Sequence, residues 1–430
     1  MNAIGIDIGT TSICGISVDI ESGSTLRSIE KNSNAFIKTQ RPWEKIQSVE
    51  KIFDLAKDIL DTLIDTETVA IGITGQMHGI VYTDKSGAAV SDLYTWQDGR
   101  GDLEYCGTTY AKALGSFSGY GNVTDFYNRI NGEVPKNAAA FCTIGDYLAM
   151  RLCGLKKPLI HTSNAASLGC FDMQKNRFTC DCDAETASDC RILGEYKNIP
   201  VSIAVGDNQA SVFSALTDED ELLINVGTGS QISVICDTPL ACDGIEIRPY
   251  FDNKYLAVGA ALCGGRAYSL LKDFVGEILG YANVSGDGAI YDVMKKMAMA
   301  VKAPSLNVDT RFDGTRDNAA IRGSVTNIGV ENFRCGELVC GVLDGIITEL
   351  YEMYVKMGVD RHGIVATGNG IRKNQLLIDS AERRFSAKLK IPVHIEEAAY
   401  GAALVSMVAC GIKKNSADAQ KLIKYRNENN

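Results

Sequence analysis

The chain has 430 residues, a formal net charge of −10, and 45 % hydrophobic against 22 % charged residues. This length suits two or three domains with cores of their own, in a globular protein. No run of about 18 apolar residues predicts a membrane span, no secretory signal is recognisable, and the acidic charge without a basic stretch argues against nucleic acid as a partner. We therefore expect a cytoplasmic protein with free thiols.

Strands and helices alternate along the first half, which favours an α/β fold. Residues 4–8 and 13–18 predict two strands around a short turn. Residues 44–63 carry apolar side chains in steps of three and four, the pattern of one helix face. Residues 69–73 predict a buried strand that ends in the loop TGQMHG.

The second half repeats this order. Residues 222–226 and 231–235 predict another strand–turn–strand, residues 338–354 a helix, and residues 363–366 a strand before the glycine turn TGNGIRKNQLL. The acidic run TDEDE at 217–221 separates the two halves. We predict two related domains, residues 1–217 and residues 218–430.

The two strand–turn–strand segments carry glycines and hydroxyls at the bend, where backbone N–H groups can bind phosphate oxygens. Asp7 precedes the first bend, and its carboxylate suits Mg²⁺. A single turn of this kind is more often an ordinary hairpin without a ligand. Two such turns at equivalent positions in the two halves of the sequence favour binding of a triphosphate from both sides. The predicted phosphate residues are Gly9, Thr10, Thr11 and Ser12 in the first turn, and Gly227, Thr228 and Gly229 in the second.

The segment GNGIRKN fits a loop over which an adenine could lie, and it is a poor dinucleotide fingerprint because a third glycine is missing. Its candidate residues are Gly368, Asn369, Gly370 and Asn374.

Asp207 follows a short apolar strand at the start of a helical run. It could be an N-cap, or it could accept the proton of an attacking hydroxyl in phosphoryl transfer. Two loops mix aromatic, amide and charged side chains as sugar sites do, although His78 and Trp96 could equally be structural. The candidates for contact with a polyol are Gln76, Met77, His78, Trp96, Asp98, Arg100, Asp207 and Asn208.

Most of the 14 cysteines stand alone in apolar segments. Cys180, Cys182 and Cys190 form one cluster, but it lacks a second pair and a nearby histidine. A surface loop is therefore favoured over a metal site.

Over nearly its whole length the sequence resembles the FGGY carbohydrate kinases. DIGTTS and NVGTGS are similar to the two phosphate motifs of the family, ATGNGIRKNQLL to its adenosine motif, and EEAAYGAAL to the connecting helix of the actin-like ATPase fold. GQMHG resembles the sugar loop and GDNQAS the segment with the catalytic base. TWQDGR and RPYFDNKYLAVGAALCGG are most similar to the sedoheptulokinase members.

The resemblance implies two actin-like (ribonuclease H-like) α/β domains with a cleft between them. It implies ATP- and Mg²⁺-dependent phosphorylation of a ketose, most like sedoheptulose, with Asp207 as base and Asp7 near the metal. A xylulokinase or another ketose or polyol kinase stays an alternative, as do a non-catalytic sugar sensor and a filament-forming actin-like ATPase. The partners expected are a small ketose and a second copy of the chain in a homodimer.

Overall fold

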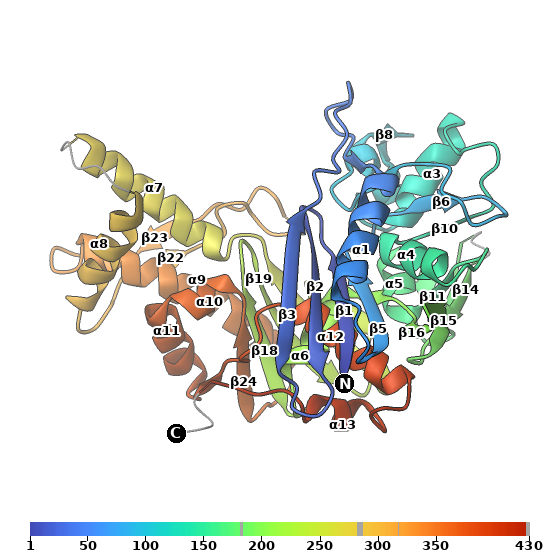
Figure 1. The fold of residues 1–430 in the computed structure, drawn as a ribbon. Coiled ribbons are helices and arrows are strands. Elements are labelled where there is room, and N and C mark those ends of the chain that lie inside the picture. The colour runs from blue at the N-terminus through green and yellow to red at the C-terminus, as the bar shows by residue number, and fades with distance from the viewer. Residues whose placement is uncertain (181–183, 282–286, 317, 427–430) are drawn as a thin grey trace. The chain divides into compact units, whose positions relative to one another are not determined.

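The computed structural model describes residues 1–180, 184–281, 287–316 and 318–426. Its chain divides into two compact units (Figure 1). The first unit contains residues 1–217, 248–255 and 394–424, and the second contains 218–247, 256–393 and the residues from 425 onward. Neither unit is one continuous stretch of chain. The assignment of functional domains to 1–217 and 218–430 stays a prediction.

The first unit is built on a seven-stranded sheet in which β1 lies between β2 and β5. β1 is antiparallel to β2, with Asp7 opposite Cys14, and parallel to β5. The predicted hairpin and the predicted third strand are therefore confirmed. The strands of this sheet are β1 Asn2–Ile8, β2 Ser12–Asp19, β3 Thr25–Asn32, β5 Thr68–Gly75, β15 Ile192–Tyr196, β16 Ile199–Ser202 and β17 Val205–Gly206.

Two helices cover opposite faces of β1. Ile4 and Ile6 belong to a core shared with α1 (Val49–Leu63), and a Cβ at Gly15, opposite Ile6, would meet the side chain of Ile59 in α1. Side chains alternate along a strand, so Gly5 faces the other way. There it touches α12 (Glu397–Ala409), a helix from near the end of the chain.

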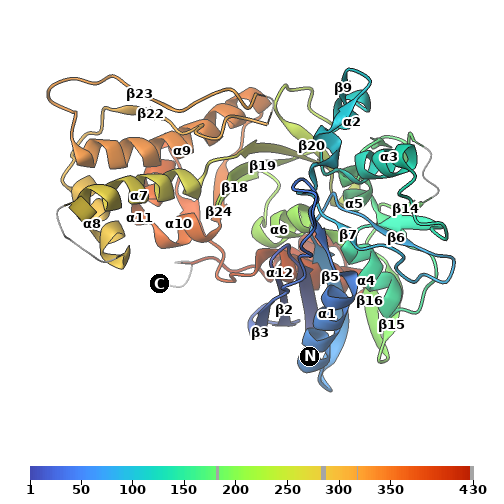
Figure 2. The same cartoon turned by 90° about the horizontal axis from the view of Figure 1, so that it is seen from above.

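Glycines allow α12 to lie directly on the sheet. A Cβ at Gly5 would stand 1.8 Å from the Ala399 carbonyl oxygen, and one at Gly72 would stand 1.8 Å from that of Ala402. On the far side of α12, Gly401 lies equally close to Ala210 of α6 (Asp207–Ala215) (Figure 2). Backbone therefore packs against backbone from β1 and β5 through α12 to α6.

We expect Gly72→Ala to destabilise the protein by about 3 kcal/mol, because the added methyl overlaps backbone atoms that cannot rotate away. Gly145→Ala in α4 is the matched control. Its Cβ would meet nothing closer than 3.6 Å, and alanine favours a helix. Thermal unfolding of both variants measures the difference, and equal melting temperatures would contradict this account of the packing.

The predicted helix over 44–63 begins later than its apolar pattern indicated. Ser48 caps α1, accepting from the Lys51 N–H, so the helix starts at Val49. Ile46–Gln47 instead form the short strand β4, which pairs with β7 (Leu93–Tyr94). The prediction of a helix over residues 44–48 was wrong. The spacing of the apolar residues indicated an earlier start, but the Ser48 side chain caps the helix and fixes its first residue at Val49.

The remaining elements of the first unit surround this sheet. They are β6 Val81–Thr83, β8 Glu104–Tyr105, β9 Thr108–Thr109, β10 Ala140–Cys142, β11 Leu159–His161, β12 Phe171–Asp172, β13 Arg177–Phe178, β14 Glu185–Ala187, the 3-10 turns Gly99–Asp102 and Phe251–Asn253, and α2 Tyr110–Ala113, α3 Gly121–Asn131, α4 Ile144–Leu152, α5 Thr162–Ser167 and α13 Ser416–Gln420.

The second unit repeats the central pairing of the first. Its sheet has the order β20-β21-β19-β18-β24-β25, with β18 antiparallel to β19 and parallel to β24. The predicted repeat is confirmed, and the predicted helix over 338–354 lies within α9. The elements are β18 Glu221–Val226, β19 Ser230–Cys236, β20 Glu246–Pro249, β21 Tyr255–Ala261, β22 Asn307–Asp309, β23 Ser324–Thr326, β24 Gly363–Thr367, β25 Leu389–Lys390, α7 Gly265–Tyr281, α8 Asp287–Met299, α9 Cys335–Met357, α10 Asn369–Lys373 and α11 Gln375–Phe385.

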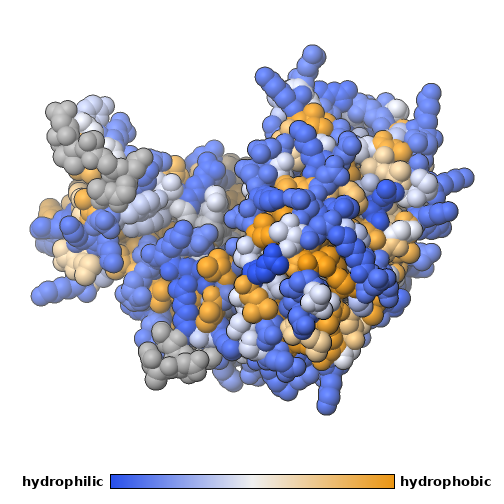
Figure 3. Space-filling model, viewed as in Figure 1, coloured by the Kyte–Doolittle hydropathy of each residue, from blue (hydrophilic) through white to orange (hydrophobic). Residues whose placement is uncertain are grey.

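Polar and charged residues cover much of the face drawn in Figure 3, with smaller apolar areas between them. Within the described residues, no helix has both the length and the apolar character that crossing a bilayer requires.

Candidate functional site

Three carboxylates from distant parts of the sequence interact in the first unit. Asp7 lies near the end of β1, Asp207 begins α6, and Glu396 precedes the first residue of α12. Burial and then the charges of Asp207 and Glu396 raise the pKa of Asp7 to about 8. The Asp7 Oδ1 atom is buried and has no hydrogen-bond partner among the described residues. Carboxylates held close together repel one another when they are ionised. A cation bound beside them would reduce this repulsion and so stabilise the folded protein.

Asp207 is the first residue of α6, and the N-cap is Gly206, which makes no side-chain cap bond. The interpretation of Asp207 as an N-cap was therefore wrong. Burial raises the pKa of Asp207 to about 6, although the charge of Arg248 and backbone N–H groups lower it. A carboxylate in this range can hold or release a proton near neutral pH.

Sequence reasoning missed Arg248 and Glu396 as members of this group. Arg248 is buried, and the segment 248–255 belongs to the first unit although its neighbours in the chain belong to the second. Glu396 lies in the EEAAYGAAL segment, which was assigned only to the connecting helix. In the sequence, Arg248 is only a single arginine before a proline, and Glu396 is only an acidic residue before a helix. Such residues are as common on ordinary protein surfaces as in functional sites.

The first glycine turn, Gly9–Ser12, is held by side chains from other elements. Gln47 donates from Nε2 to the Thr10 carbonyl at 2.6 Å, and the Trp96 indole donates from Nε1 to the Thr10 hydroxyl at 3.0 Å. Ser12 donates its hydroxyl to Glu30 at 2.8 Å. Thr11 is exposed. The carbonyl and the hydroxyl of Thr10 are thus both bound within the protein, while Thr11 stays exposed to solvent.

The predicted sugar loop follows β5 directly. Gln76 is buried, and its Nε2 donates to Gln47 Oε1 at 2.9 Å. Met77 is buried with its sulfur against Gly206, the residue before Asp207. His78 has a left-handed backbone (φ 72°), and its Nδ1 lies 2.8 Å from the Ser167 carbonyl oxygen. Met77 therefore links this loop to Asp207, whereas the His78 ring is held at Nδ1 by the protein.

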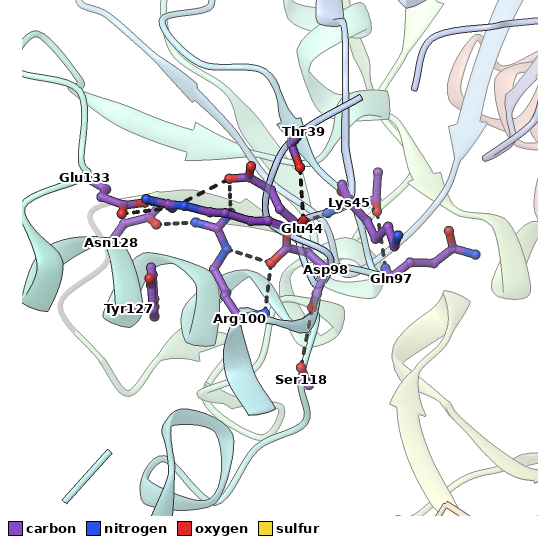
Figure 4. A network of polar contacts seen from close by, with 12 residues as sticks. Thr39, Glu44, Lys45, Gln97, Asp98, Arg100, Ser118, Tyr127, Asn128 and Glu133 are labelled. Atoms are coloured by element: carbon purple, nitrogen blue, oxygen red, sulfur yellow. Dashed lines mark hydrogen bonds and ion pairs between the residues drawn. The ribbon is translucent and has the colours of Figure 1, made fainter. Parts of the chain in front are cut away.

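Asp98 and Arg100 form a buried ion pair (Figure 4). Arg100 Nε donates to Asp98 Oδ1 at 2.7 Å, and its guanidinium also contacts Asn128 and lies 4.3 Å from the centre of the Tyr94 ring. Asp98 Oδ2 accepts from the Lys45 N–H at 3.0 Å. These bonds occupy the atoms proposed for sugar contact and favour a role in anchoring the loop that carries Trp96. Trp96 itself is 46 % exposed.

In the second unit the turn Gly227–Gly229 packs on the start of α7. Gly265 and Arg266 donate their N–H groups to the Gly227 and Thr228 carbonyls at 2.9 and 3.0 Å. Thr228 is exposed. As in the first turn, bonds to the carbonyls fix the backbone and leave the outer side accessible.

The predicted adenosine segment lies beside this turn. Gly368 has a φ of 88°, and a Cβ on it would stand 2.5 Å from the Val226 carbonyl oxygen. Gly370 is similarly close to Val226, at the end of β18, and Asn369 begins α10. Asn374 caps α11 by accepting from the Leu376 N–H, so its oxygen is already engaged. The second unit thus brings both predicted nucleotide segments together.

The cysteine cluster shows no metal geometry in the described chain. Cys180 and Cys190 are free thiols, Cys182 lies outside the described residues, and no described group of three or more His, Cys, Asp or Glu side chains could hold a metal ion.

Comparison with known proteins supports the resemblance to the carbohydrate kinases. Residues 2–108 match the N-terminal domain of the FGGY family of carbohydrate kinases. The sedoheptulokinase of Mus musculus is 27 % identical over 470 residues, an alignment that covers 94 % of this chain and 97 % of that protein. The N-terminal part of the chain therefore resembles the N-terminal domain of these kinases, and nearly the whole chain resembles a sedoheptulokinase. The chain is also 22 % identical over 462 residues to a xylulose kinase of Staphylococcus epidermidis, covering 95 % and 88 % of the two chains.

The fold of this chain is similar to that of solved sugar kinases. The xylulose kinase of Lactobacillus acidophilus, solved with bound ligand, superposes with a TM-score of 0.83 at 19 % identity, covering 99 % of this chain and 92 % of that one. The predicted fold of two actin-like α/β domains is confirmed. The match of residues 2–108 and the full-length relatives support the predicted carbohydrate kinase activity. The predicted cleft between the domains stays a prediction.

Proposed function

We propose that the protein transfers the γ-phosphoryl group of ATP to the terminal hydroxyl of a ketose, and that the ketose is sedoheptulose. The observation that carries the chemistry is Asp207, a carboxylate with a raised pKa beside Arg248 and Asp7. The choice of sugar is supported by the similarity to the murine sedoheptulokinase along nearly the full length of both chains.

In this proposal Asp207 accepts the proton of the sugar hydroxyl as its oxygen attacks the phosphorus atom. Met77 places an apolar group against Gly206, the residue before Asp207. Arg248 keeps part of the Asp207 population ionised despite burial, because its positive charge opposes the desolvation. The two glycine turns supply backbone N–H groups and hydroxyls for the phosphates.

Asp7 fits a magnesium ion held by a single carboxylate and otherwise by water, since no three His, Cys, Asp or Glu side chains of the described residues are grouped as ligands. The Oδ1 atom lacks a hydrogen-bond partner among the described residues, and the neighbouring Asp207 and Glu396 add negative charge. Asp7 would hold the ion largely through water, as Mg²⁺ usually is in nucleotide sites. When bound, Mg²⁺ neutralises charge on the phosphates.

The pH profile should report Asp207. Its pKa of about 6 predicts that kcat/KM falls about tenfold per pH unit below pH 6, because the protonated acid cannot accept the hydroxyl proton. Above pH 6 the rate should level off. Initial rates at subsaturating sugar and Mg-ATP between pH 5 and 8 measure this, and a rate that is flat from pH 5 to 7 would argue against Asp207 as the base.

A ketose panel tests the substrate. Sedoheptulose, xylulose, ribulose and fructose, with glycerol as a short polyol, are supplied with Mg-ATP, and ADP release is followed. We expect sedoheptulose to give the highest kcat/KM. A preference for xylulose would favour the alternative that the staphylococcal relative supports.

Other outcomes would assign a different function. Binding of a ketose without any phosphorylated product would indicate a sugar sensor, and ATP-dependent sedimentation would indicate a filament. Cytoplasmic location and a homodimer stay predictions.

A further inference from the structure

Thr10, in the first glycine turn, is bound by two side chains from one small ribbon. β4 carries Gln47 and pairs with β7, and Trp96 follows β7 by two residues. Gln47 reaches the Thr10 carbonyl and Trp96 reaches the Thr10 hydroxyl. The ribbon and the residue that follows it therefore bind both the carbonyl and the hydroxyl of Thr10.

In each of these hydrogen bonds, the donor and the acceptor can be assigned in only one way. A carbonyl can only accept, so Gln47 must present Nε2 to Thr10 and its Oε1 to Gln76, which in turn presents Nε2. An indole N–H can only donate, so the Thr10 hydroxyl oxygen accepts from Trp96. The hydroxyl proton of Thr10 is left to donate elsewhere, and an anionic oxygen is the acceptor that gains most from it.

We propose that Gln47 and Trp96 are positioning residues that hold Thr10 so that its hydroxyl donates to a phosphate oxygen of the nucleotide. The inference rests on the part of the proposed function that places nucleotide phosphate at the first glycine turn. It gives Trp96 a role different from the sugar contact expected of it, and it gives a role to Gln47, which sequence reasoning passed over.

The same bonds connect two parts of the proposed site. Gln47 joins the Thr10 backbone to Gln76 in the predicted sugar loop, and Gln76 is further fixed by its N–H, which donates to the Ile8 carbonyl at 2.9 Å. Ordering of either loop therefore restrains the other. Sugar and nucleotide should consequently bind with positive coupling, which the removal of Gln47 weakens.

A double-mutant cycle on the full chain tests the hydroxyl contact. The variants are Thr10→Val, Trp96→Phe and the pair, and calorimetry measures the Kd of Mg-ATP without sugar. We expect each single change to weaken ATP binding about three- to tenfold, the range of one hydrogen bond. The double variant should bind no more weakly than the weaker single variant, because both remove the same interaction.

Gln47→Glu tests the carbonyl contact. The carboxylate can still accept from Gln76 but cannot donate to Thr10, so ATP affinity and its enhancement by sugar should both fall at least threefold. Gln420→Leu is the matched control, since Gln420 donates to the Phe213 carbonyl, far from this ribbon in the sequence. It should change neither quantity.

Independent effects of Thr10→Val and Trp96→Phe, or a Trp96→Phe variant that alters only the KM of the sugar, would overturn the inference. Failure of the proposed function would give a different result. Mg-ATP would bind, and the double variant would bind it no more weakly than the weaker single variant, but no ketose would be phosphorylated. The chain has only two tryptophans, so a Trp43→Phe background also lets Trp96 fluorescence report ATP at Thr10 directly.

Discussion

Asp207→Asn should lower kcat by about 10²- to 10⁴-fold, while the Kd of Mg-ATP changes little. The amide has nearly the shape of the carboxyl and keeps a contact with backbone N–H groups, but it cannot take up the hydroxyl proton. The variant should also lose the decline in rate below pH 6, because the group that titrates there is gone. Single-turnover rates and calorimetry with Mg-ATP separate the two effects.

Asp58→Asn is a suitable control for that experiment. Asp58 is exposed and pairs with Lys31 on the surface, so its replacement should leave turnover unchanged. Turnover of Asp207→Asn within a few-fold of the natural protein would mean that another group accepts the proton.

Asp7→Asn should have opposite effects on activity and on stability. Activity with Mg-ATP should fall about 10²-fold or more, because the carboxylate proposed to hold the metal loses its charge. Stability of the ligand-free protein at pH 8 should rise, on the order of 1 kcal/mol after solvent screening. Burial of the Asp7 carboxylate, and then the charges of Asp207 and Glu396, disfavour its ionised form, and an uncharged asparagine removes that cost.

The sign of the stability effect follows from the raised pKa of Asp7. Below about pH 4 the acid is protonated in both folded and unfolded chains, so asparagine gains nothing. As the pH rises toward about 8, the unfolded chain ionises freely while the folded chain resists, and the natural protein loses stability. Melting curves at pH 5, 6.5 and 8 should therefore diverge with pH. A variant less stable than the natural protein at pH 8 would show that Asp7 stabilises the fold instead.

Much of the fold could be predicted because it is repeated and local. Alternating apolar strands beside glycine turns mark β1, β2, β18 and β19, and the steps of three and four along α9 mark a helix whatever its surroundings. The start of α1 could not be placed from its apolar residues alone, because the Ser48 cap and the pairing of β4 with β7 decide it.

The site was only partly predictable, for a different reason. Asp7 and Asp207 are recognisable because each ends a strand or begins a helix within a motif. Arg248 and Glu396 join them through tertiary packing of segments that lie 41 and 189 residues beyond Asp207 in this numbering, and no local pattern reports such a meeting. Arg100 is the opposite case. The sequence predicted it as a sugar contact, but its side chain is fully buried and paired with Asp98.

The position of α12 has a consequence for how the polypeptide is made. The helix that lies against Gly5 and Gly72 is translated long after the strands that it covers. While the ribosome is still translating the middle of the chain, α12 does not yet cover its face of the first sheet. Until α12 is made, this face is either bound by chaperones or exposed to solvent. A gene fragment that stops at residue 217 should therefore yield insoluble material, whereas co-expression with a peptide spanning 394–424 should rescue it.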